Sequence, residues 1–118
     1  MNALFAFFFF ALADAQPLDA ARLEVLLTGN TLRIQVAPDR TAALYFAPDG
    51  SVRAVMPDGT ADTGKWSLPS EGGYCISWEK GPKRSCSRVL WHPGEIRLID
   101  AQGNLRGTIT QITVGKEH

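Results

Sequence analysis

Cysteine and histidine are scarce in this sequence of 118 residues, which contains two of each. The cysteines are Cys75 and Cys86, and the histidines are His92 and the terminal His118. Structural zinc sites draw four ligands from closely spaced Cys or His pairs, and no such spacing occurs in this chain. No nucleotide-binding motif rises above background either. The sequence therefore predicts no metal centre and no cofactor.

An excess of charge of either sign is also absent, because Lys plus Arg and Asp plus Glu each number 12. A neutral surface gives no electrostatic attraction for nucleic acid or an anionic membrane, so we expect neither as a partner. Hydrophobic residues make up 45% of the chain, as in an ordinary globular protein, and the length suits one domain.

The apolar run at the N-terminus covers residues 3–12 and includes five Phe residues. It is about half the length that a membrane-spanning helix needs, and Ala13-Asp14-Ala15 follows it as a small-x-small cleavage site. The pattern predicts a secretory signal over residues 1–15, with only transient membrane contact. No Lys or Arg precedes the run, so either the signal is atypical or the true start lies upstream. The alternatives are a buried element of the domain and a retained membrane anchor.

Residues 17–27 have the pattern of a helix. Asp19 is placed to cap its N-terminus, and Leu23, Leu26 and Leu27 fall on one face at three- and four-residue spacing. A helix this short is not stable alone in water, so we expect it to pack on a sheet.

From residue 30 onward the apolar pattern alternates, as it does in strands that bury one face. Turn-forming Pro, Asp and Gly residues separate the runs, and the phase of the last run slips between Ile109 and Ile112, which indicates a β-bulge. The chain is therefore predicted to be all-β with one short N-terminal helix. Residues 16–118 would form one small domain, an eight-stranded antiparallel meander closed into a lipocalin-like barrel. A β-sandwich is the alternative. The eight runs lie at residues 30–36, 42–46, 52–56, 63–68, 74–78, 86–91, 96–98 and 105–114.

The two cysteines fit a hairpin in this pattern. If Cys75 faces Cys86, then Ile76 faces Ser85 and the apolar residues of both strands share one sheet face. We therefore predict a Cys75–Cys86 disulfide, which would persist in an oxidising compartment.

Large aromatic side chains are numerous for a domain of this size. Those placed to line a ligand cavity in a barrel are Trp66, Tyr74, Trp78 and Trp91. The alternative, which we favour, is that they fill the core of a solid barrel.

A resemblance to a known family rests on four segments: LLTGNTL at residues 26–32, YFAPDG at 45–50, GKWS at 64–67, and CISW at 75–78 with the later Cys86. Together they resemble small exported proteobacterial proteins catalogued as domain of unknown function 995. The second segment is also similar to lipocalin-like small domains. The resemblance implies export and a β-rich fold. It implies no activity, because that family has no established one.

These features together predict an exported, non-enzymatic binding or interaction module of the bacterial cell envelope, periplasmic or extracellular. Its partner would be a small apolar ligand in the barrel interior, or an envelope protein such as an exported enzyme that it inhibits. A hollow barrel would favour the ligand, and a filled barrel with an exposed apolar patch would favour the protein. A hydrolase that uses His92, or Asp49 and Asp58, is the rival hypothesis. We favour turn roles for all three residues.

Overall fold

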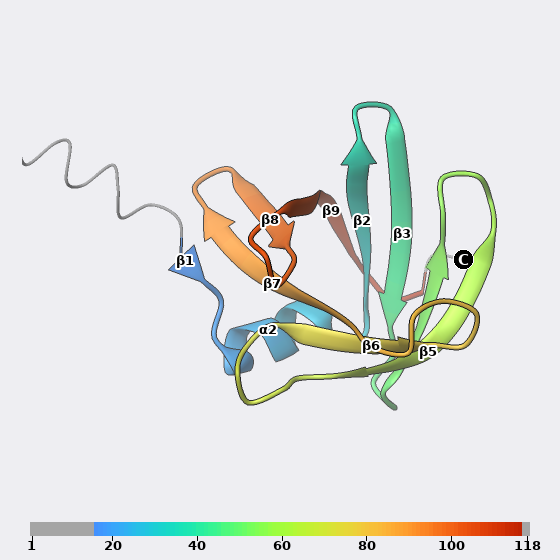
Figure 1. Ribbon diagram of the computed structural model, residues 1–118, viewed down its shortest axis with the longest axis horizontal. Coiled ribbons are helices and arrows are strands. Elements are labelled where there is room, and N and C mark those ends of the chain that lie inside the picture. The colour runs from blue at the N-terminus through green and yellow to red at the C-terminus, as the bar shows by residue number, and fades with distance from the viewer. Residues whose placement is uncertain (1–15, 117–118) are drawn as a thin grey trace, which may run out of the picture.

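The computed structural model describes residues 16–116, so the predicted secretory signal over residues 1–15 lies outside the described residues. The described chain forms an eight-stranded antiparallel barrel with one more strand outside it and one short helix (Figure 1). The predicted barrel is confirmed, and the β-sandwich alternative is wrong. In chain order the elements are β1 (Gln16–Pro17), α2 (Ala20–Leu27), β2 (Asn30–Ala37), β3 (Arg40–Phe46), β4 (Ser51–Val55), β5 (Ala61–Ser67), β6 (Tyr74–Trp78), β7 (Ser85–His92), β8 (Glu95–Ile99) and β9 (Leu105–Val114).

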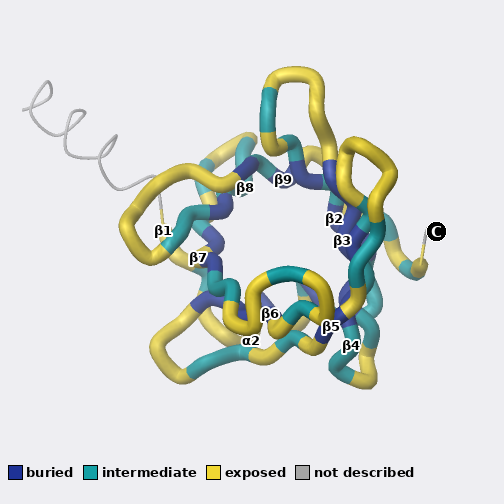
Figure 2. Tube along the Cα trace, turned by 45° about the vertical axis from the view of Figure 1, so that its right-hand side comes forward, coloured by how far each residue is buried: buried dark blue, intermediate teal, exposed yellow. Residues whose placement is uncertain are grey.

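The barrel is a simple meander. Each strand from β2 to β9 pairs with the next one along the chain, and β9 pairs back with β2 to close the ring (Figure 2). Because successive strands run in opposite directions, their connections alternate between the two ends. The connections at 38–39, 56–60, 79–84 and 100–104 share one end, which we call the open end. Helix α2 and the connections at 47–50, 68–73 and 93–94 share the other, the helix end.

Helix α2 begins at Ala20, three residues later than predicted. Its cap is as expected, because an Asp19 carboxylate oxygen accepts a hydrogen bond from the Arg22 backbone N–H at 2.9 Å. The residues before the cap form β1 instead, where Pro17 pairs with Leu90 of β7. A two-residue strand that contains proline has no periodicity by which the sequence could have revealed it.

The helix packs through its predicted face. Leu23 and Leu27 are fully buried in the hydrophobic core, and Leu26 is partly buried against it. Since a helix of eight residues is not stable alone, burial of this face holds it over the end of the barrel.

Two local features shape the sheet. The predicted bulge in β9 is confirmed, because Arg33 pairs with Gln111 while its neighbour Ile34 pairs with Ile109, which leaves Thr110 as the extra residue. On β5, Gly64 allows a close approach to β6, since a Cβ added there would overlap the backbone carbonyl of Ser77.

Candidate ligand-binding cavity

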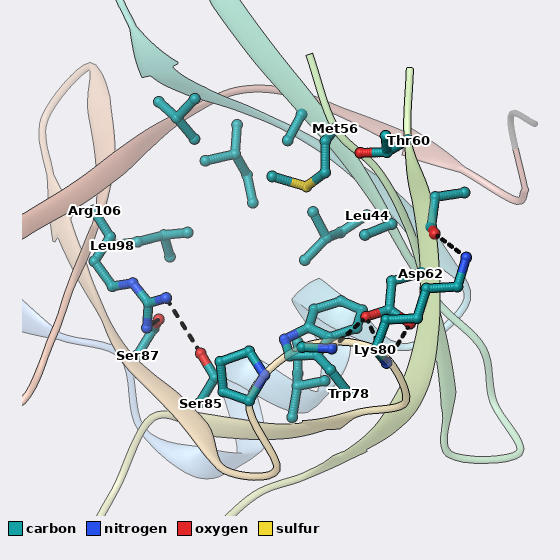
Figure 3. Close-up of a pocket in the computed structure, with 18 of the residues that line it drawn as sticks. Leu44, Met56, Thr60, Asp62, Trp78, Lys80, Ser85, Ser87, Leu98 and Arg106 are labelled. Carbon is teal, nitrogen blue, oxygen red and sulfur yellow. Dashed lines mark hydrogen bonds between the residues drawn. The ribbon is translucent and has the colours of Figure 1, made fainter. Parts of the chain in front are cut away.

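The interior of the barrel is filled at the helix end and hollow toward the open end. A cavity of about 660 Å³ lies there (Figure 3), within the usual size range of small-molecule sites. Its walls are mainly apolar and come from most of the strands around the ring. The side chains that define its walls include Ile34, Leu44, Ala54, Ile76, Trp78 and Leu98.

An aromatic cluster closes the cavity on the helix side. The ring of Phe46 packs edge-on against Trp66 at 5.6 Å and against Tyr74 at 5.4 Å between centroids. The Trp66 indole N–H donates to the Ala47 carbonyl at 3.1 Å, which anchors this ring beside the β3–β4 connection. Phe46 and Tyr74 are buried in the core, and Trp66 is partly buried against it.

The four aromatic residues that the sequence offered as possible cavity lining, with core filling as the favoured alternative, have different positions. Tyr74 and Trp78 line the cavity. Trp66 does not, because it lies near the helix end of β5, packed on Phe46. Trp91 does not either, because it lies near the helix end of β7, beyond the buried Val89, and is 47% exposed. All four occupy positions that alternation assigns to the same sheet face. Their position along the barrel axis decides which of them line the cavity.

Two apolar side chains at the ends of the runs 30–36 and 52–56 lie at the rim. Val36 and Met56 line the cavity but are 44% and 41% exposed, because β2 and the end of β4 carry them to the open end. The mouth of the cavity is therefore partly apolar.

One group of polar side chains in the cavity wall lies on β7 and the start of β9. The Arg106 guanidinium donates to the Ser87 hydroxyl at 3.1 Å, to the Ser85 hydroxyl at 3.2 Å and to the Cys86 carbonyl at 3.1 Å. Ser87 is buried, and its hydroxyl acts on the Tyr74 phenol. Burial raises the pKa of that phenol, and the Ser87 contact opposes the rise.

Arg106 faces the cavity because of a second bulge. Leu98 of β8 pairs with Gly107, but the next residue, Ile99, pairs with Leu105, so Arg106 is the extra residue of β9. A bulge changes the direction of the side chain that it carries. Sequence reasoning missed this residue, because regular alternation places Arg106 on the outer face, opposite to Ile109.

On the other side of the mouth, Asp62 holds the β6–β7 loop. Its carboxylate accepts hydrogen bonds from the backbone N–H groups of Lys80 at 3.1 Å and Gly81 at 3.0 Å. Burial by itself would raise the pKa of Asp62, but these bonds and one from the Thr63 N–H hold it below its ordinary value. Asp62 therefore acts as a loop anchor at the rim, and periodicity alone gave no sign of it.

The predicted disulfide between Cys75 and Cys86 is confirmed, with the two residues directly opposite in the β6–β7 ladder. Ile76 faces Ser85 in the same ladder, as expected. The crosslink thus joins the two strands whose inner faces supply Tyr74, Ile76, Ser85 and Ser87 to the cavity.

The residues of the hydrolase hypothesis do not meet. Asp49 and Asp58 are exposed in turns at opposite ends of the barrel, and each accepts hydrogen bonds within its own turn, from Ser51 and Thr60 respectively. The Ser51 and Thr60 hydroxyls and N–H groups lower the pKa of these two carboxyls. His92 ends β7, paired with Glu95, and none of the three lines the cavity.

Over residues 16–116, no group of three or more His, Cys, Asp or Glu side chains is arranged to hold a metal ion. In the same range, no helix has the length and the apolar character that crossing a membrane requires. Helix α2 has only eight residues.

Comparison with known proteins gives no match to a family model and no significant match to a curated protein. The resemblance to the exported family of unknown function therefore stays a prediction.

Proposed function

We propose that this chain is an exported, non-enzymatic binding protein that holds a small apolar ligand inside its barrel. The observation that carries the proposal is the cavity of about 660 Å³, walled by apolar side chains and by Tyr74 and Trp78. A concave, mainly apolar site with a few convergent polar groups is the usual form of a small-molecule site.

The hollow interior favours a ligand over a protein partner. A module that acts only through its loops has no need of a cavity, and unfilled interior costs stability because its walls lose packing contacts. Retention of such a space is therefore better explained by a ligand that fills it.

The disulfide supports the export part of the proposal, since disulfides persist in oxidising compartments. N-terminal sequencing of the protein recovered from the producing cell tests it. The expected first residue is Gln16, and recovery of an intact Met1 terminus would contradict cleavage of the signal.

Ligand binding can be tested with the neutral fluorescent dye N-phenylnaphthylamine. We expect the dye to bind one site per chain and to change the tryptophan emission, because Trp78 lines the cavity. The Trp78→Phe variant should lose most of that change, whereas Trp91→Phe should retain it, because Trp91 lies outside the cavity. An emission change that depends on Trp91 would contradict the site.

A second pair of variants tests the space itself. Ala54 lies in the cavity wall, so Ala54→Phe should fill part of the cavity and weaken dye binding at least about tenfold. Ala21→Phe adds the same ring to the exposed face of α2 and serves as the matched control. Circular dichroism verifies that both variants are folded. Equal dye affinity in both would exclude the interior as the binding site.

A further inference from the structure

The Arg106 side chain is the unusual feature of the cavity wall. It starts from β9 and reaches acceptors at the start of β7, beyond the end of β8, and it lines the cavity (Figure 3). Its three acceptors are two hydroxyls and a carbonyl, all neutral. They fix the orientation of the guanidinium without neutralising its charge.

No ion pair of Arg106 occurs within residues 16–116. The Arg106 charge acts on Asp100, whose carboxylate accepts hydrogen bonds from the Gln102 and Asn104 N–H groups at 2.9 Å. The Asn104 N–H is the main cause of its lowered pKa, and the Arg106 charge adds a smaller effect. Asp100 is therefore engaged in its own turn.

The other charged groups of the wall are also engaged. Asp62 holds the backbone of the β6–β7 loop, and the Lys80 ammonium donates to the Ala61 carbonyl at 3.2 Å. In Figure 3 both lie across the cavity from Arg106. Of the two cavity-lining cations, Arg106 is thus the one whose side chain is held by hydroxyl groups, whereas Lys80 lies beside the Asp62 carboxylate.

The guanidinium also has donors left for a ligand. It carries five N–H groups, and the three hydrogen bonds to β7 leave two of them for another acceptor. Guanidinium groups bind carboxylate and phosphate oxygens through paired, charge-assisted hydrogen bonds.

We propose that the ligand is an amphiphile, with an apolar body in the cavity and an oxyanion head group held by Arg106 beside Ser85 and Ser87. The inference rests on the proposed function. The bulge in β9 would then serve ligand binding, because it turns the Arg106 side chain toward the cavity. Arg106 is exposed overall, so the head group would lie at the mouth, where the anion keeps part of its hydration.

The test compares three ligands with the same alkyl chain: dodecanoate, dodecyl phosphate and the neutral dodecanol. Each is measured at neutral pH by displacement of N-phenylnaphthylamine. We expect at least one of the two anions to bind at least about tenfold more tightly than dodecanol, as one charge-assisted pair at a partly hydrated site would produce. The tighter of the two anions identifies the oxyanion.

Three variants test whether Arg106 causes the preference for anionic ligands over dodecanol. Arg106→Gln should reduce the anion preference to about threefold or less, whereas Arg106→Lys should keep most of it because the charge remains. Arg88→Gln is the matched control, since Arg88 is exposed on β7, outside the cavity lining. Dye and dodecanol affinities close to those of the unmodified chain show that each variant is folded.

The outcomes separate the two proposals. If the dye binds and dodecanol competes as well as both anions, the oxyanion site is refuted while the apolar carrier stands. An anion preference that survives in Arg106→Gln likewise refutes the assignment to Arg106. If neither the dye nor any of the three ligands binds, both proposals fail.

Discussion

Removal of the Cys75–Cys86 disulfide should weaken the fold substantially. The proposed change is the double substitution Cys75→Ala and Cys86→Ala, which leaves the two strands paired but not crosslinked. The cysteines face each other in the ladder, and their sequence separation is 11. The crosslink therefore closes a short loop in the unfolded chain, and its loss frees that loop.

The magnitude follows from the loop length. A closed loop with a sequence separation of 11 corresponds to about 3 kcal/mol of lost stabilisation in the loop-entropy model. Small domains have a total free energy of unfolding of roughly 5–15 kcal/mol, so this is a large fraction. With a urea m-value of about 1.5 kcal/mol/M, the unfolding midpoint should fall by about 2 M.

Urea denaturation followed by circular dichroism measures the loss. The unmodified chain under a strong thiol reductant is the matched control and should show a similar shift. A change below about 1 kcal/mol in both samples would refute the loop-entropy reasoning for this hairpin, and a shift in the variant alone would point instead to the buried Cys75 side chain.

Three further outcomes are expected. Gly64→Ala should destabilise the barrel by about 1–3 kcal/mol in urea denaturation, because the new methyl group overlaps the Ser77 carbonyl, and an unchanged midpoint would contradict this close approach. The Ser51 and Thr60 hydroxyls lower the pKa of Asp49 and Asp58, so both carboxyls add stability above their unfolded-state pKa of about 3.9 and lose it as the pH falls through their folded-state values. The thermal stability of Asp58→Asn should therefore fall less between neutral and strongly acidic pH than that of the unmodified chain. An identical fall in both would contradict a stabilising role of the ionised Asp58 carboxylate. Burial raises the pKa of Tyr74, so the folded chain should lose stability as the pH rises through about 10, the unfolded-state value. In alkaline urea titrations, Tyr74→Phe should reduce that loss of stability. An equal loss in both chains would show that Tyr74 is not its cause.

The strands and their pairing were predictable from the sequence because they depend on local chemistry. Alternation assigns each side chain to a face, and Pro-Asp-Gly steps form tight turns between the runs. The Cys75–Cys86 register and the bulge at Thr110 both follow from this alternation, and both are present in the structure. The Asp19 cap is of the same kind, since a cap depends on a few neighbouring residues.

The cavity was not predictable in this way. Trp66 and Trp78 alternate inward alike, yet Trp66 packs against the core near the helix end and Trp78 lines the hollow part near the open end. The two residues differ in their position along the barrel axis. Whether such a position is filled or hollow depends on where α2 and Phe46 occupy the interior. The strand β1 is a similar case, because its two residues pair with β7 only once the barrel exists.

The sequence by itself determined the all-β meander, the short capped helix and the cysteine pairing, because each arises from residues that are neighbours along the chain or across one hairpin. Only the tertiary structure decided that the barrel is hollow and that Arg106 faces its interior. The hollow space depends on how side chains from eight strands and α2 fill a closed ring. The direction of Arg106 depends on a one-residue shift between β8 and β9, which reverses the face that alternation assigns.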